Sequence, residues 1–138
     1  MSSDTILTAA HCPNGGDIDV VVAVVGDHNI FEIDGNEQRI PIKELIIHPK
    51  YNKSNSNEYD LAIIKLAEPI IFTEYVGTIC LPSVDKNYDN VTAKISGWGQ
   101  SHHGEEYHFS DVLREVKQGA NQSKLKLYSF EPRLQFKL

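Results

Sequence analysis

The sequence is poor in cysteine and contains no long hydrophobic segment. Its 138 residues include two cysteines, Cys12 and Cys80, which can form at most one internal disulfide. The longest apolar run, residues 18–25, is interrupted by Asp19. It is far shorter than the roughly 20 apolar residues that cross a bilayer. The composition therefore argues against a membrane span.

The first residues also lack the basic and apolar regions of a secretory signal peptide. We therefore expect the polypeptide, taken literally, to stay in the cytosol.

The chain also has no excess of basic residues over most of its length. The formal net charge is −6, and residues 1–116 are acidic whereas residues 117–138 are basic. Because nucleic acid is bound through basic surfaces, an acidic body argues against a nucleic-acid partner. The basic tail is most simply a solvated segment.

What the sequence does contain is a series of short segments that are rich in β-branched residues and separated by turns. This pattern favours an all-β barrel or sandwich in a chain the size of one domain. We find no internal repeat and no convincing amphipathic helix. Strands are expected at residues 5–9, 18–25, 39–48, 61–66, 94–96 and 112–116.

Six local motifs follow one another along the same part of the chain. Residues 8–12 read Thr-Ala-Ala-His-Cys and residues 60–66 read Asp-Leu-Ala-Ile-Ile-Lys-Leu. The others are Ile-Ile-His-Pro-Lys-Tyr at 46–51, Ile-Cys-Leu-Pro at 79–82, Ile-Ser-Gly-Trp-Gly at 95–99 and Leu-Arg-Glu-Val at 113–116. In order and spacing these motifs resemble the trypsin- and chymotrypsin-like serine proteases.

The resemblance covers roughly residues 2–116 and implies an all-β, trypsin-like double barrel that is incomplete. Residues 1–116 would form most of the first barrel and the start of the second, whereas residues 117–138 read as a divergent tail. The sequence is therefore expected to be truncated at both ends. The missing strands would leave sheet edges open, which predicts poor folding or self-association.

The resemblance implies that His11 is the general base and Asp60 the carboxylate that orients it. No serine after Asp60 lies in the glycine-flanked turn that would hold the nucleophile. We therefore expect a fragment of a serine endopeptidase that is inactive as it stands. The intact family member would act outside the cell on protein or peptide substrates. The alternative is a non-catalytic, pseudoprotease-type binding module.

A second candidate site lies in the acidic segment 27–37, which is similar to the calcium loop of trypsins. Calcium prefers carboxylate and carbonyl oxygens. The resemblance implies that Asp27 and Glu37 supply carboxylates and that Asn29 and Glu32 supply backbone carbonyls. Asp34 would bind the ion directly or through water. An acidic, solvated loop is the alternative, and an aspartate at the first position is one methylene shorter than the family's usual glutamate.

Three weaker signals concern the cysteines, a histidine-rich segment and glycosylation. The resemblance implies that the cysteine after the histidine pairs with an upstream cysteine, but none precedes Cys12. A bridge between Cys12 and Cys80 is disfavoured. Residues 101–108 contain histidines and glutamates in a spacing that fits no zinc signature. The N-glycosylation pattern occurs at Asn52, Asn90 and Asn121.

Overall fold

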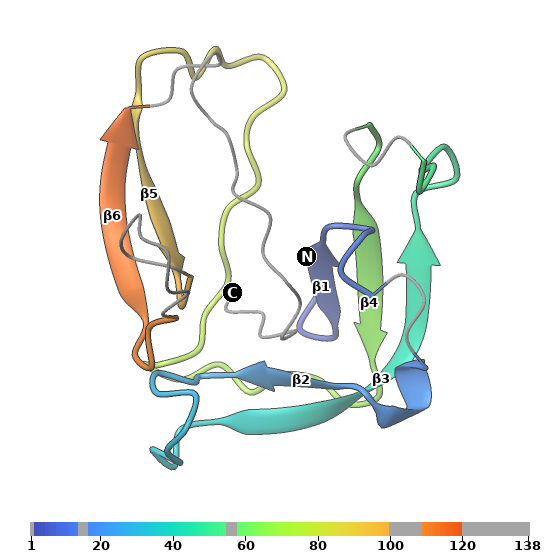
Figure 1. Cartoon of the computed structure of the whole chain (residues 1–138), viewed down its shortest axis with the longest axis vertical. Helices are drawn as coiled ribbons and strands as arrows, with labels where there is room; N and C mark the ends of the chain where they lie inside the picture. The colour runs from blue at the N-terminus through green and yellow to red at the C-terminus, as the bar shows by residue number, and fades with distance from the viewer. Residues whose placement is uncertain (1, 14–16, 55–57, 100–108, 120–138) are drawn as a thin grey trace. The chain divides into compact units, whose positions relative to one another are not determined.

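The computed structural model describes residues 2–13, 17–54, 58–99 and 109–119 (Figure 1). These residues form six β-strands and one short 3₁₀-helix, so the described fold is all-β, as expected. The chain divides into two compact units. Of the described residues, those within Met1–Gly26 and Gly35–Ile79 belong to unit 1, whereas Asp27–Asp34 and those from Cys80 to Gly119 belong to unit 2. Each unit is described by itself.

Unit 1 contains a four-stranded antiparallel sheet in the order β1-β4-β3-β2 (Figure 1). Its strands are β1 at Thr5–Thr8, β2 at Val22–Val25, β3 at Gln38–Ile47 and β4 at Ala62–Leu66. The register between β3 and β4 shifts between Ile42 and Glu44. Such a bulge bends a strand and increases its twist. β3 accordingly curves, so that its first half pairs with β2 and its second half with β4.

The core of unit 1 lies on the inner face of this curled sheet. Alternate residues of a strand point to opposite faces, and Ile6 on β1 lies opposite Ile64 on β4 with both side chains fully buried. The remaining members of the core cluster are Ala23, Val25, Ile40, Ile42, Leu66, Ile70 and Val76. Since β1 and β2 are the outer strands of the sheet, unit 1 is part of a barrel whose described strands do not close. The expectation of an incomplete, all-β barrel is thus confirmed for the described residues of this unit.

Unit 2 contains a two-stranded antiparallel sheet of β5, Thr92–Gly97, and β6, Arg114–Gly119. Trp98 follows β5 directly, is buried, and donates a hydrogen bond from Nε1 to the backbone oxygen of His28 at 2.9 Å. Leu113 donates its backbone N–H to the same oxygen at 2.8 Å. One backbone oxygen of segment Asp27–Asp34 is therefore bonded to the residue that follows β5, through its side chain, and to the residue that precedes β6, through its backbone.

Two expected strands differ from the structure. Residues 18–20 form the 3₁₀-helix η1, Ile18–Val20, because the side chain of Asp17 accepts a hydrogen bond from the backbone of Asp19 and caps this turn. The strand expected at residues 18–25 therefore starts only at Val22. The strand expected at residues 112–116 is displaced to β6. The Ser110 hydroxyl donates to the backbone oxygen of Val112 at 2.8 Å, so this oxygen is engaged locally just before the ladder begins.

Several predictions lie outside the described residues: the zinc alternative at 101–108, the sequon at Asn121 and the tail from residue 120. Cys12 and Cys80 are both free thiols. Within the described parts of the chain, no helix has the length and hydrophobicity needed to cross a bilayer.

Candidate active site

The pairing of β1 with β4 brings the two predicted catalytic residues to the same end of the sheet. The strands are antiparallel, and Thr8 at the end of β1 lies opposite Ala62 at the start of β4. His11 follows β1 by three residues, and Asp60 precedes β4 by two. Two residues 49 positions apart in the sequence are thereby adjacent in the fold.

The turn that carries His11 depends on small side chains. Cys12 donates its backbone N–H to Ala9 O at 3.3 Å, which closes the turn directly after β1. Ala10 is fully buried, so a larger side chain at this position would need space that the packed interior does not provide. The imidazole of His11 remains on the surface, with 41% of the side chain exposed.

Asp60 accepts two hydrogen bonds from His11, one for each carboxylate oxygen. Oδ2 lies 2.6 Å from Nδ1 of the imidazole, and Oδ1 accepts the backbone N–H of His11 at 2.9 Å. The Asp60 side chain is 23% exposed, so the pair is partly shielded from solvent. The ring contact orients the imidazole, and the backbone bond holds the carboxylate against the turn that carries His11.

The electrostatics of the pair define the tautomer of His11. Burial by itself would raise the pKa of Asp60, but hydrogen bonds from the His11 ring and from the backbone of His11 and Ala10 outweigh it and lower the pKa. Asp60 is therefore ionised at neutral pH and acts as an acceptor. The neutral imidazole then carries its proton on Nδ1, which leaves the lone pair on Nε2 as the basic position.

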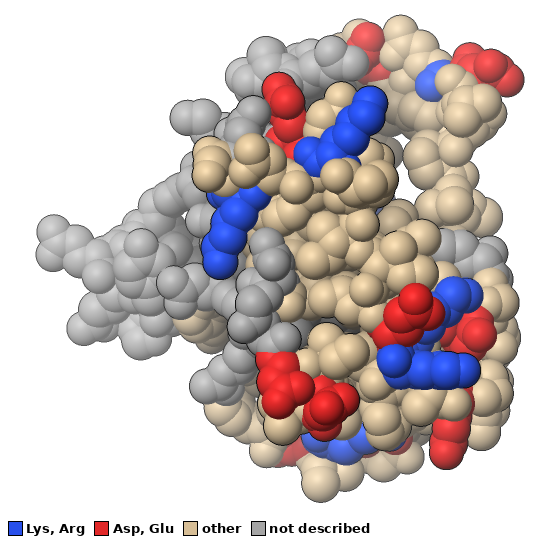
Figure 2. Space-filling view, turned by 90° about the vertical axis from the view of Figure 1, so that its right-hand side faces the viewer, with Lys and Arg blue, Asp and Glu red and all other residues tan. Residues whose placement is uncertain are grey.

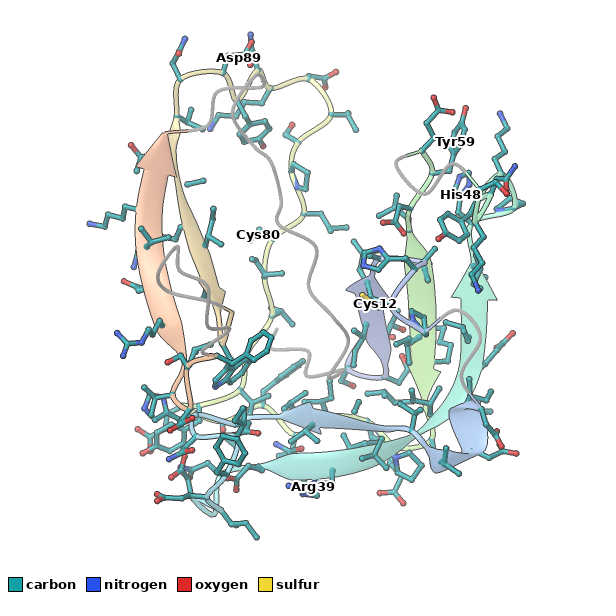
Figure 3. The ribbon with its side chains drawn as sticks, in the orientation of Figure 1. Cys12, Arg39, His48, Tyr59, Cys80 and Asp89 are labelled. Carbon is teal, nitrogen blue, oxygen red and sulfur yellow. The ribbon has the colours of Figure 1, made fainter. Side chains whose placement is uncertain are left out.

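The thiol of Cys12 lies beside this basic nitrogen, with Sγ 3.5 Å from Nε2 of His11. Burial raises the pKa of the Cys12 thiol; a hydrogen bond with Thr8 opposes this effect, and the negative charge of Asp60 adds to it. The sulfur is therefore a protonated thiol at neutral pH. Figure 3 shows Cys12 beside the end of β1.

A feature that sequence reasoning missed lies directly before Asp60. Tyr59 has a φ of +55°, in the left-handed region that tyrosine rarely adopts. Its ring stacks on that of His48, with centroids 5.0 Å apart and an interplanar angle of 13° (Figure 3). The sequence gives no signal for this arrangement, since it depends on a contact between two residues in different parts of a loop.

The predicted calcium ligands are divided between the two units. In unit 2, Asp27 is buried whereas Glu32 and Asp34 are exposed. Asn29 accepts the backbone N–H of Glu32 on its carbonyl at 3.2 Å. In unit 1, Glu37 accepts the backbone N–H of Gly35 on Oε2 at 2.9 Å.

The described residues contain no group of three or more His, Cys, Asp or Glu side chains that could hold a metal ion. The loop predicted to bind calcium would also use the backbone carbonyls of Asn29 and Glu32, which such a count of side chains does not include. Calcium binding therefore stays a prediction.

The family model described as Trypsin matches residues 1–127. The venom serine protease Bi-VSP of Bombus ignitus is 40% identical over 124 residues, which cover 85% of this chain and 33% of that protein. Transmembrane protease serine 9 of Rattus norvegicus is 30% identical over 128 residues, 91% of this chain and 12% of that protein. Ovochymase of Halocynthia roretzi is 32% identical over 119 residues, which cover 85% of this chain and 7% of that protein.

The chain covers a third or less of the length of each of these relatives, so the activity of a whole protein is a separate question. The boundary predicted at residue 116, between the protease-like part of the chain and a divergent tail, stays a prediction. The family match nevertheless spans most of the sequence and includes both His11 and Asp60. The chain therefore belongs to the trypsin family of serine proteases.

Proposed function

We propose that this chain is the part of a trypsin-like serine endopeptidase that carries the general base, His11, and its orienting carboxylate, Asp60. The observation that carries the proposal is the 2.6 Å contact between Asp60 Oδ2 and His11 Nδ1. A carboxylate in this place holds the imidazole in one tautomer and stabilises the imidazolium that forms when the ring takes up a proton. These roles are those of the family itself and come to the chain through its membership.

In the proposed reaction, Nε2 of His11 takes the proton of an attacking hydroxyl. The same nitrogen later returns the proton to the leaving amine of the cleaved peptide bond. Asp60 remains ionised and keeps the ring in place through both steps, because its two oxygens are held by the ring and by the backbone of His11. Acyl transfer also requires a nucleophile and donors that stabilise the oxyanion.

We propose that the 138 residues alone do not hydrolyse peptide bonds. None of the serines after Asp60 lies between glycines in a turn that would expose a hydroxyl and supply oxyanion-hole amides. These serines are Ser83, Ser96, Ser101, Ser110, Ser123 and Ser129. The chain would then be a fragment whose nucleophile is encoded outside the present sequence. The rival proposal is a non-catalytic module that binds a partner.

The proposed setting is extracellular, and the proposed substrates are proteins or peptides. A relative named as a venom protease supports the setting, and membership in a protease family supports the substrate class. The surface is compatible with a protein partner: on the face drawn in Figure 2, acidic and basic side chains lie next to one another.

A structural calcium ion is a further proposal for segment 27–37. The donor set of carboxylates from Asp27, Asp34 and Glu37 and carbonyls from Asn29 and Glu32 consists of oxygens, which suits this cation. The ion would supply positive charge to an acidic loop and would stabilise the fold without taking part in the chemistry. An acidic, solvated loop remains the competing interpretation.

Self-association through open sheet edges is also proposed. β1 and β2 are the outer strands of the sheet in unit 1. An outer strand presents a row of backbone N–H and C=O groups that can pair with another chain. Val22 on β2 is 40% exposed, so an apolar side chain lies at the surface of this edge strand.

Peptide hydrolysis by a longer product tests the proposed function. A longer protein, encoded by these 138 codons together with the genomic sequence on both sides of them, would be expressed and assayed with fluorogenic peptides. We expect activity that His11→Ala and Asp60→Asn lower by several orders of magnitude, since the residues of such a unit act together. His28→Ala, which replaces an exposed histidine, should retain activity. Full activity in His11→Ala would refute the proposal.

A further inference from the structure

Both sequence neighbours of Asp60 are held by one residue, His48. On one side, the ring of Tyr59 stacks on the imidazole of His48 with centroids 5.0 Å apart (Figure 3). On the other side, Leu61 accepts the backbone N–H of His48 on its carbonyl oxygen at 2.9 Å. His48 follows β3 and Asp60 precedes β4, so these contacts join the end of one strand to the start of the next.

His48 is itself fixed by its local turn. Its Nδ1 accepts the backbone N–H of Lys50 at 3.2 Å, and its carbonyl oxygen accepts the backbone N–H of Tyr51 at 2.9 Å. The Lys50 ammonium lies 5.4 Å from the centroid of the Tyr59 ring. Tyr59 is therefore contacted by an aromatic ring and by a cation, although 47% of its surface is exposed.

The backbone of Tyr59 explains why such support is needed. Among the described non-glycine residues, positive φ occurs at Tyr59 and at Asn90. Asparagine tolerates the left-handed region, whereas a bulky side chain is disfavoured there. Leu61 donates its backbone N–H to Tyr59 O at 2.7 Å, which closes a tight turn around Asp60. The unusual conformation persists only because its surroundings over-determine it.

We propose that Tyr59 and His48 are positioning residues that direct the carboxylate of Asp60 at His11. The left-handed conformation of Tyr59 sets the direction in which the next residue projects, and the stack with His48 stabilises that conformation. The two hydrogen bonds from His11 to Asp60 require this direction, because each uses a different carboxylate oxygen. The catalytic meaning of this arrangement rests on the proposed function, but the arrangement itself is tested without peptidase activity.

Hydrogen exchange of the His11 backbone amide reports on this arrangement directly, since this N–H donates to Asp60 Oδ1. In the 138-residue chain, Tyr59→Phe keeps the ring and should keep the protection of this amide. Tyr59→Val places a β-branched residue at positive φ and should lower the protection by roughly tenfold. Tyr59→Asn should retain most of it, because asparagine adopts this conformation without the stack. His48→Ala should lower the protection when Tyr59 is present.

The amides of β4 and the variant Tyr75→Val provide the controls. Tyr75 is an exposed tyrosine of the same unit whose φ is not positive. Its replacement should leave His11 unchanged, and the β4 amides should stay protected in every variant. His48→Ala should have little effect in the Tyr59→Asn background.

Three results would overturn the proposal. The first is equal His11 protection in Tyr59→Val and Tyr59→Phe. The second is a loss that spreads equally to the β4 amides. The third is a wild-type His11 amide that exchanges as fast as it does in urea. A failure of the longer product to hydrolyse peptides would leave these exchange results unaffected.

Discussion

Replacing Asp60 with asparagine isolates what the charge of its carboxylate contributes to the fold. The carboxylate accepts the His11 ring at 2.6 Å and the His11 backbone at 2.9 Å. Asparagine has nearly the same shape but offers one oxygen acceptor and an NH₂ group that only donates. One of the two His11 donors therefore loses its acceptor, and the other bond is no longer assisted by charge.

The size of the effect follows from these two bonds and their exposure. A hydrogen bond to a charged group contributes about 1.5–3 kcal/mol. The His11 and Asp60 side chains are 41% and 23% exposed, so solvent weakens the interaction. We expect Asp60→Asn to lower the free energy of unfolding by about 1–2 kcal/mol at neutral pH. With a urea m-value of about 2 kcal/mol per M, the middle of the usual range, the midpoint should fall by roughly 0.5–1 M.

The pH dependence has a definite sign. Burial opposes the shift, but the hydrogen bonds from His11 outweigh it and lower the pKa of Asp60 in the fold. A lowered pKa contributes stability that is fully present above the unfolded pKa, about 3.9 for aspartate. This stability is lost as the pH falls through the folded pKa. The difference between wild type and Asp60→Asn should therefore be present at pH 5–7 and shrink below about pH 4.

Urea unfolding at micromolar protein concentration and with a reducing agent measures this difference. Asp19→Asn provides the matched control, because Asp19 is an exposed aspartate of the same unit. Asp19→Asn should change the free energy of unfolding by less than about 0.5 kcal/mol. Equal stability of wild type and Asp60→Asn at pH 7, or a difference that grows as the pH falls, would refute the reasoning.

Three further predictions concern the core, the acidic loop and the sheet edge. Ile64→Ala should lower the free energy of unfolding by about 2–5 kcal/mol in urea titrations, because this side chain is fully buried in the central part of the core; a loss below about 1 kcal/mol would contradict this packing. Millimolar calcium should raise the melting temperature relative to chelator, and Glu37→Gln should abolish the increase; identical melts for wild type with and without calcium would rule the site out. Val22→Lys should reduce self-association in light scattering under reducing conditions, since a charge on an edge strand opposes pairing. A wild-type chain that stays monomeric at every concentration measured would contradict the proposed edge pairing.

The sequence predicted the elements whose signals are local and repeated. The strand at Ala62–Leu66 follows from a run of apolar residues after Asp60, and β1 follows from the residues before His11. Neighbouring antiparallel strands then bring these two residues together. The strand predicted at residues 18–20 was wrong because two effects compete there. β-branched side chains favour a strand, but Asp17 caps a turn.

The support of Asp60 could not be predicted from the sequence. Tyrosine has no preference for the left-handed region, and its presence there at position 59 depends on a ring 11 positions earlier in the chain. The contact of the Cys12 thiol with His11 is likewise a matter of side-chain conformation. Such features are decided by tertiary contacts, and they lie beside the predicted catalytic pair, where backbone strain tends to occur.

Covalent labelling with a fluorophosphonate probe, followed by mass-spectrometric mapping, tests the central claim most directly. This probe reacts with a serine that a neighbouring base activates. The account predicts no labelled serine in the 138-residue chain. It predicts one labelled, glycine-flanked serine in a longer product, with labelling lost in His11→Ala. A labelled serine within residues 1–138, or labelling of the longer product that survives His11→Ala, would contradict the account.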